Sequence, residues 1–152
     1  MNSINIRIRK AEISDMPVIF NLVRELAEYE KEPHAVTADI TDYNEAFNQQ
    51  LIEGLIVESD GIAVGMAVYY MTFSTWKGKS LYLEDFYIQP AYRKLGIGQQ
   101  LFDAFLDEAI KKGVKQVKWQ VLDWNELALK FYRKNHAVIE TNWWNGKLFI
   151  GS

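Results

Sequence analysis

Hydrophobic and polar positions follow two different periods along the chain, and these periods separate strands from helices. Ile4, Ile6 and Ile8 alternate with polar residues, which is typical of a half-buried strand. Asp60-Gly61 lies between two further strand patterns and favours a hairpin. Strands are also predicted at residues 51–59, 62–73, 80–88 and 116–121.

Apolar residues spaced by three or four positions predict four amphipathic helices. These helices span residues 14–29, 37–47, 96–112 and 125–134. Their expected N-terminal caps are Ser14 or Asp15, Thr37, and Asn125 or Asp123, and Gly113 is expected to end the third helix. The remaining C-terminal residues predict one or two more strands. The order β-α-α-β-β-β-α-β-α-β indicates an α/β fold with a mixed sheet, in a single domain over residues 1–152.

Composition narrows the chemistry that the chain can perform. The 152 residues are 49% apolar and 24% charged, as in globular proteins. They include no cysteine and only two histidines, so disulfides, thiolate metal sites and a cysteine nucleophile are excluded, and we expect no metal. No apolar run is long enough to span a bilayer and the N-terminus is polar, which predicts a cytoplasmic protein with no membrane partner.

Charge is distributed unevenly along the chain. The formal net charge of -3 argues against a dedicated nucleic-acid binder. Residues 1–76 carry 5 basic against 12 acidic residues, whereas residues 77–152 carry 12 against 8. An acidic half and a basic half suit an enzyme that binds a cationic substrate and an anionic cofactor. Two solvated surfaces with no role in binding would give the same distribution of charge.

A glycine-containing segment lies between the fourth predicted strand and the third predicted helix. Glycines allow backbone to approach a ligand closely, and the N–H groups at a helix N-terminus bind phosphate with help from nearby cations. The segment therefore fits a pyrophosphate-binding turn, although such turns also occur without a ligand. It contains neither a P-loop nor the dinucleotide-binding fingerprint. Its residues are Arg93, Lys94, Leu95, Gly96, Ile97 and Gly98.

With this segment the sequence resembles the GNAT superfamily of N-acetyltransferases, whose acetyl-coenzyme A loop reads Gln/Arg-x-x-Gly-x-Gly/Ala. Within the superfamily it is most similar to the diamine (spermidine/spermine) and thialysine acetyltransferases. Four segments carry this likeness in the right order: residues 24–30, 74–79, 81–86 and 121–125.

The resemblance implies where acetyl-coenzyme A binds. The backbone of Phe86, Tyr87 and Ile88 would pair with the pantetheine arm, in a gap where the mostly antiparallel sheet splays between strands four and five. The pyrophosphate would lie on Arg93 and on residues 94–99, which end at Gln99. The other side of the cofactor would be lined by Asn125, Glu126, Leu127 and Ala128.

Tyr132 and Glu84 are the candidate catalytic residues. A thiol that leaves as thiolate needs a proton, and a phenol is a weak acid of comparable strength. By resemblance Tyr132 is this general acid. An attacking amine must lose a proton, which a carboxylate can accept. Glu84 and Asp85 are adjacent on a strand and are expected to point to opposite faces, so only one should serve the site, and the resemblance favours Glu84.

Other residues are candidates for binding the amine. Tyr29 and Glu30 end the first helix, where negative charge opposes the helix dipole, and similar enzymes bind polyamine at this place. Trp76 and Trp119 can flank an alkyl chain or a cation, with Gln120 beside Trp119. Tyr29 and Glu30 could instead form a solvated helix end, and the two tryptophans could instead pack the core.

Two departures from the resembled family concern the C-terminal part. His136 replaces the glycine that usually ends the tyrosine helix, and we expect Asn135 to adopt the left-handed conformation instead. Trp144 stands where diamine acetyltransferases have a carboxylate that reaches the polyamine. Apolar residues near the C-terminus, together with the resemblance, predict a homodimer.

These observations predict an acetyl-coenzyme A dependent N-acetyltransferase. Its acceptor would be a primary amine of a small cation, such as a polyamine, a diamine or a lysine-like amine, attacking directly in a ternary complex. Two alternatives remain: acetylation of a protein amino group, and a non-catalytic sensor of coenzyme A or polyamine. The presence of both Tyr132 and Glu84 argues against the sensor.

Overall fold

The computed structural model describes residues 5–151, so the predicted strand residue Ile4 lies outside the described residues. The chain divides after Gln120 into two compact units, and each is treated by itself below. No helix within the described range is both long and apolar enough to cross a membrane.

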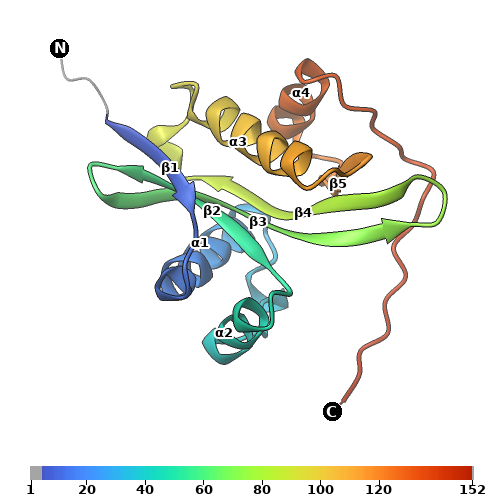
Figure 1. The fold of residues 1–152 in the computed structure, drawn as a ribbon, viewed down its shortest axis with the longest axis horizontal. Coiled ribbons are helices and arrows are strands. Elements are labelled where there is room, and N and C mark those ends of the chain that lie inside the picture. The colour runs from blue at the N-terminus through green and yellow to red at the C-terminus, as the bar shows by residue number, and fades with distance from the viewer. Residues whose placement is uncertain (1–4, 152) are drawn as a thin grey trace. The chain divides into compact units, whose positions relative to one another are not determined.

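The first unit is built on a five-stranded sheet with the order β1-β2-β3-β4-β5 (Figure 1). The first four strands pair antiparallel with their neighbours, and β5 runs parallel to β4. This arrangement confirms the predicted α/β fold with a mixed, mostly antiparallel sheet. The strands are β1 (Ile6–Lys10), β2 (Glu53–Ser59), β3 (Ile62–Ser74), β4 (Gly78–Ile88) and β5 (Gln116–Trp119).

The helices of this unit begin and end close to the predicted positions. They are α1 (Met16–Tyr29), α2 (Ile40–Asn48) and α3 (Ile97–Lys111), with 3-10 turns at Ile13–Asp15, Pro33–Ala35 and Pro90–Tyr92. The predicted cap of α2 at Thr37 is wrong. Asp39 caps α2 because its carboxylate accepts a hydrogen bond from the Asp42 N–H (3.1 Å), and Asp42 in turn accepts from the Asp39 N–H (2.8 Å).

Helices cover both faces of the sheet. α1 and α2 lie on one face, and α3 lies on the other (Figure 1). The α1 side contains a buried cluster that includes Met16 and Leu22 of α1, Met66 and Val68 of β3, and Tyr87 of β4. On the α3 side, aromatic rings join the helix to the sheet. These ring pairs are Tyr69 with Phe105 and Phe86 with Phe102.

A β-bulge interrupts the pairing of β3 with β4 at Glu84. Tyr69 pairs with Leu83 and Val68 pairs with Asp85, so Glu84 is an extra residue in β4. A bulge of this kind resets the alternation of side chains along the strand. Asp85 shares a face with Tyr87, which packs in the α1-side cluster.

Glu84 lies on that same α1 side. Its carboxylate accepts a hydrogen bond from the Tyr70 hydroxyl (3.1 Å), and Tyr70 follows Val68 by two positions on β3. The expectation that Glu84 and Asp85 point to opposite faces is therefore wrong. It assumed regular alternation, and the bulge breaks that alternation between these two residues.

The sheet opens between β4 and β5, as the resemblance implies. The parallel pairing runs from Ser80 with Gln116 to Leu83 with Trp119 and then stops. β4 continues to Ile88 beyond this point. The far half of β4 therefore presents an edge that no other described strand covers on that side.

The second unit contains α4 (Glu126–Lys134), which Asn125 caps by accepting a hydrogen bond from the Ala128 N–H (3.2 Å). The end of α4 differs from expectation. Asn135 has a φ of -89°, and His136 is the left-handed residue with a φ of 67°. The Ala137 N–H reaches the Tyr132 carbonyl (3.0 Å) and the His136 N–H reaches that of Arg133 (3.0 Å), which makes His136 the C′ residue of a Schellman motif.

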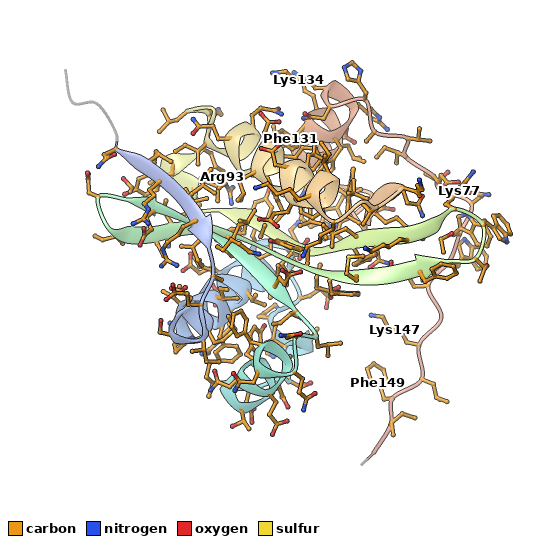
Figure 2. The ribbon with its side chains drawn as sticks, viewed as in Figure 1. Lys77, Arg93, Phe131, Lys134, Lys147 and Phe149 are labelled. Carbon is orange, nitrogen blue, oxygen red and sulfur yellow. The ribbon has the colours of Figure 1, made fainter. Side chains whose placement is uncertain are left out.

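The predicted terminal strands are not formed among the described residues. Residues 137–151 contain no helix or strand (Figure 2, where Lys147 and Phe149 mark this segment). Trp144, Leu148 and Phe149 are 95%, 87% and 87% exposed. A strand needs a neighbour to accept its backbone hydrogen bonds, and the sequence pattern carries no information on whether one is present.

Candidate active site

Three carboxylates lie close enough on the α1 side of the sheet, next to the bulge, for two of them to act electrostatically on the third. Glu84 and Asp85 come from β4, and Glu30 is the C-terminal cap residue of α1. The pKa of Asp85 is raised from 3.8 to about 7 by burial, followed by the negative charges of Glu84 and Glu30. Burial also raises the pKa of Glu30. This concentration of unneutralised negative charge is suited to a cation.

Tyrosines form the rest of this acidic site. The Tyr70 and Tyr82 rings lie 5.3 Å apart across β3 and β4, and the Tyr70 hydroxyl donates to Glu84. Burial, Glu84 and its hydrogen bond raise the pKa of Tyr70 to about 12. Burial, Asp85 and Glu84 raise the pKa of Tyr43, on α2, to about 12. These phenols therefore stay protonated and leave the negative charge to the carboxylates.

The Asp85 carboxylate has no hydrogen-bond donor among residues 5–151. A partly buried carboxylate normally accepts such bonds, because desolvation without compensation is costly. An ammonium group would supply both the missing donors and the missing positive charge. The arrangement can therefore hold a protonated amine, and it can accept a proton near neutral pH.

The open edge of β4 leads to the start of α3. The Gln89 N–H donates to the Val64 carbonyl on β3 (2.9 Å). Backbone groups along a strand alternate in direction, so the N–H and C=O of Ile88 and Phe86 point away from β3, toward the uncovered edge. Tyr87, the third residue predicted to pair with pantetheine, directs its backbone toward β3.

The glycine turn leaves its backbone open at the start of α3. Gly96 caps α3 with a φ of 78°, and Lys94 is also left-handed with a φ of 66°. A Cβ added at Gly96 or Gly98 would meet no described atom within 4 Å. Packing within the described protein thus gives no reason for glycine at position 98, whereas a ligand held close to the backbone does. The first N–H groups of a helix have no acceptor within the helix and can bind phosphate.

The Arg93 side chain is engaged by neighbouring residues of the first unit. Its Nε donates to the Ile88 carbonyl (2.9 Å). Its guanidinium carbon lies 4.8 Å from the Tyr29 ring centroid and 5.5 Å from that of Tyr87. Arg93 therefore joins the segment before α3 to the end of α1, and Tyr29, predicted to bind substrate, contacts this guanidinium (Arg93 is labelled in Figure 2).

The tryptophans lie in different places. Trp76 is 81% exposed in the turn between β3 and β4. From Gly78 the strand runs about 20 Å before it reaches Glu84, so this chain does not bring Trp76 to the acidic site. Trp119 ends β5 and packs edge-on against Phe102 of α3 (5.7 Å between centroids), with Gln120 after it. Trp119 thus lies on the α3 side of the sheet.

The second unit carries the remaining predicted residues. Tyr132 is buried on α4, with its ring 5.5 Å from that of Phe131. Asn125, Glu126, Leu127 and Ala128 form the cap and first turn of α4, where Leu127 is 68% exposed. The roles of Tyr132 and of this first turn stay predictions.

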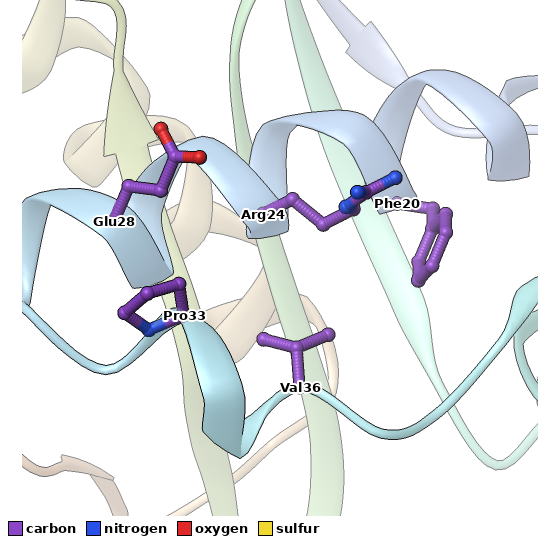
Figure 3. Close-up of a pocket in the computed structure, with 5 residues that line it drawn as sticks. All are labelled: Phe20, Arg24, Glu28, Pro33 and Val36. Atoms are coloured by element: carbon purple, nitrogen blue, oxygen red, sulfur yellow. The ribbon is translucent and has the colours of Figure 1, made fainter.

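A separate shallow pocket of about 200 Å³ lies against α1 (Figure 3). Phe20, Arg24 and Glu28 come from α1, and Pro33 and Val36 come from the segment that follows. The Arg24 guanidinium lies 5.7 Å from the Phe20 ring centroid. None of the predicted site residues lines this pocket. Among residues 5–151, no three His, Cys, Asp or Glu side chains gather so that they could hold a metal.

Several residues of the acidic site were not selected from the sequence. Regular alternation along the strand predicts that Asp85 points away from Glu84, which excludes it from the expected site. Tyr82 precedes Glu84 by two positions, and this spacing was an available signal. Tyr70 and Tyr43 come from another strand and from α2, so only the strand register and the helix packing reveal them.

Comparison with known proteins identifies the family. The model of the Acetyltransferase (GNAT) family matches residues 16–137, and the chain belongs to this family. The chain is thus an acetyl-coenzyme A dependent N-acetyltransferase, which confirms the resemblance and the enzyme class predicted from the sequence.

The chain is similar to several curated members. Thialysine N-epsilon-acetyltransferase of Mus musculus is 39% identical over 137 residues, covering 84% of this chain and 81% of the relative. The Bos taurus protein of that name is 35% identical over 160 residues, covering 96% and 93%. Spermidine/spermine N(1)-acetyltransferase-like protein 1 of Homo sapiens is 35% identical over 141 residues, covering 87% of this chain and 20% of that protein.

Solved structures confirm the fold. An aminoglycoside acetyltransferase from an uncultured soil metagenomic sample matches with a TM-score of 0.80 at 19% identity, covering 96% of this chain and 97% of the other. At this identity the match concerns the fold alone.

Proposed function

We propose that the enzyme transfers the acetyl group of acetyl-coenzyme A to a primary amine of a small cation, such as a polyamine, a diamine or a lysine-like amine. The observation that carries this proposal is the bulge in β4, which brings Glu84 and Asp85 to one face beside Glu30. The names of the thialysine and spermidine/spermine relatives support the same class of acceptor.

The acidic site supports a substrate with a second positive charge. Three carboxylates exceed what one reacting ammonium group needs, and the Asp85 carboxylate has no donor within residues 5–151. A second ammonium or a charged chain can occupy the remaining carboxylates. A neutral amine would leave them unpaired, which costs binding free energy.

The residues that we propose for acetyl-coenzyme A fit an anionic cofactor with a long amide-containing arm. The backbone of residues 94–99, around the exposed Lys94 and the open positions at Gly96 and Gly98, would hold the pyrophosphate. The backbone of Phe86 and Ile88 on the uncovered edge of β4 would pair with the pantetheine arm. The thioester supplies an activated acetyl group with a thiolate leaving group.

We propose direct attack in a ternary complex, since the sequence has no cysteine to carry the acetyl group. Glu84 or Asp85 accepts one proton from the substrate ammonium, and the freed lone pair forms the new C–N bond as the C–S bond breaks. The attacking nitrogen loses its second proton to solvent or carboxylate. Tyr132 donates the phenolic proton to the departing sulfur.

We also propose a homodimer. Its support is the exposed apolar segment near the C-terminus, in which Trp144, Leu148 and Phe149 are almost fully accessible. Exposed apolar segments of this kind are typical of protein interfaces.

A panel of acceptors tests the function. Release of free coenzyme A is followed with polyamines, diamines, thialysine and lysine, and with neutral and anionic amines as comparison. We expect the highest kcat/KM for acceptors with an extra positive charge, and a preference that weakens with salt.

Matched variants test whether the acidic site causes the preference for a second positive charge. Glu30→Gln should reduce the preference for a second positive charge, whereas Asp107→Asn, the same charge change at an exposed position of α3, should leave it intact. Preference for an acidic acceptor, activity on peptides only, or coenzyme A binding without turnover would each refute the proposal.

A further inference from the structure

Arg93 is the first residue of the R-x-x-G-x-G segment, yet its side chain is engaged by the protein itself. Its Nε donates to the Ile88 carbonyl at 2.9 Å. Its guanidinium lies over two tyrosine rings, 4.8 Å from that of Tyr29 and 5.5 Å from that of Tyr87. One planar cation thus contacts the end of β4 and the last turn of α1.

These contacts continue into the acidic site. Tyr29 is the last residue of α1, and the next residue is Glu30, whose charge acts on Asp85. The chain turns there through a Schellman motif, in which the Glu32 N–H donates to the Ala27 carbonyl (2.9 Å) and the Lys31 N–H to that of Glu28 (3.0 Å). Lys31 has a φ of 64°, which is unfavourable for a residue with a Cβ. An external contact is therefore valuable for keeping this helix end in place.

A second contact joins the end of β4 to α1, one helical turn before Tyr29. The Tyr87 hydroxyl donates to Glu25 Oε1 (3.2 Å), and Gln89 Nε2 donates to the same carboxylate (3.3 Å). β4 and α1 are thus joined at Glu25 and again at Tyr29. The link at Tyr29 depends on the Arg93 side chain, whereas the link at Glu25 does not.

We infer that Arg93 is a positioning residue, which holds the end of α1, and thereby Glu30 of the acidic site, through Tyr29, and that it does not bind the cofactor pyrophosphate. This inference rests on the proposed function where it concerns the amine. It assigns the pyrophosphate to Lys94 and the backbone of the glycine turn, and it differs from the sequence-based prediction for Arg93. The physical reason is that the Arg93 guanidinium is already engaged with the Tyr29 and Tyr87 rings and with the Ile88 carbonyl, whereas Lys94 is exposed.

Three variants separate the two roles. Arg93→Lys keeps the charge but loses the planar group and Nε, so a phosphate ligand would be largely preserved while a stacked positioning residue would be lost. Arg93→Gln removes the charge. Lys94→Gln is the matched control, the same loss of charge at the adjacent, exposed position.

The first measurement is calorimetric binding of coenzyme A, which needs no turnover. We expect Arg93→Lys and Arg93→Gln to leave the Kd within about twofold and Lys94→Gln to raise it several-fold. A large rise in Kd for Arg93→Gln that Arg93→Lys reverses would overturn the inference.

The second measurement is hydrogen exchange at the N–H groups of Glu30, Lys31 and Glu32, which close the end of α1. We expect exchange to become roughly tenfold faster in both Arg93 variants and to be unchanged in Lys94→Gln. Unchanged exchange in the Arg93 variants would overturn the inference whatever the enzyme acetylates.

The third measurement is steady-state kinetics with the preferred amine at saturating acetyl-coenzyme A. We expect the amine KM to rise about fivefold to tenfold in Arg93→Lys, the factor that loss of the hydrogen bond from Nε to the Ile88 carbonyl supports. Tyr29→Leu should have a similar effect, and the double variant should be no worse than the more affected single variant. Additive effects would show that the two residues act separately. Failure of the wild type to acetylate any amine would instead refute the proposed function.

Discussion

The Asp85→Asn variant tests whether the bulge places a carboxylate that destabilises the folded protein when it is ionised. The effect of this variant on stability can be worked out from the structure. The pKa of Asp85 is about 7 in the folded protein, against 3.8 for an unperturbed aspartate. Between these two pH values the folded state binds more protons than the unfolded state. Stability therefore falls as pH rises through this window, and the loss is complete above pH 7.

The magnitude follows from the two pKa values. Relative to a neutral side chain, Asp85 lowers the free energy of unfolding by about 1.5 kcal/mol at pH 5 and by about 4 kcal/mol at pH 8. Solvent reaches the partly buried carboxyl and screens part of this difference. We therefore expect the stabilisation by Asp85→Asn to increase by on the order of 2 kcal/mol between pH 5 and pH 8.

Urea unfolding at the two pH values measures this change. Any packing cost of the amide is the same at both, so it cancels from the comparison. Asp107→Asn, at an exposed position of α3, is the control and should show no such increase. An Asp85→Asn effect that is equal at pH 5 and pH 8 would refute the reasoning, because it would mean that Asp85 titrates normally.

Four further outcomes are expected. Gly98→Trp should abolish most coenzyme A binding in calorimetry while circular dichroism stays unchanged, because a Cβ at position 98 meets no described atom within 4 Å and the indole would block the proposed pyrophosphate subsite. Tyr132→Phe should lower kcat by roughly 10² to 10⁴ at every pH. The rate of Glu84→Gln should instead recover at high pH, where the amine loses its proton without help. Normal turnover of Tyr132→Phe would mean that this residue only packs the helix. His136→Gly should raise the free energy of unfolding by about 1 kcal/mol, since the φ of 67° disfavours a residue with a Cβ, and an unchanged denaturation midpoint would contradict this. Sedimentation at micromolar concentration should show a dimer, and a monomer would exclude the proposed interface.

Local patterns predicted most of the fold. The strands and helices of the first unit depend on the period of apolar residues and on nearby signals such as Gly113 after α3, where φ is 71°. Asp15 precedes α1, but its carboxylate accepts from the Glu12 N–H and makes no cap hydrogen bond to this helix. The caps at Thr37 and Asn135 were wrong because several suitable residues lie close together, and only the backbone selects among them. The terminal strands were wrong because strand formation depends on a distant neighbour.

The site was less predictable than the fold for one physical reason. A bulge is an extra residue in one strand relative to its partner, so it exists only in the pairing of β3 with β4. Nothing in residues 81–88 alone distinguishes it from regular alternation. Motif resemblance could select Glu84, but it could not show that Asp85 shares its face or that Tyr43 and Tyr70 complete the site.

The features that we propose make this site reactive also lower the stability of the folded protein. This cost distinguishes residues of the site from residues that only stabilise the fold. Asp85 loses hydration without gaining a donor within residues 5–151, and Lys31 and Lys94 hold left-handed backbone beside the two proposed subsites. A carboxylate in a structural role behaves in the opposite way. The pKa of Asp15 is lowered by its hydrogen bonds with Arg9 (2.7 and 2.8 Å). Asp15 therefore stabilises the fold above its unfolded pKa and loses this contribution in acid. The sign of the pH dependence thus distinguishes the two kinds of carboxylate, because removing the charge at Asp85 should stabilise the protein at pH 8, whereas Asp15→Asn should destabilise it there.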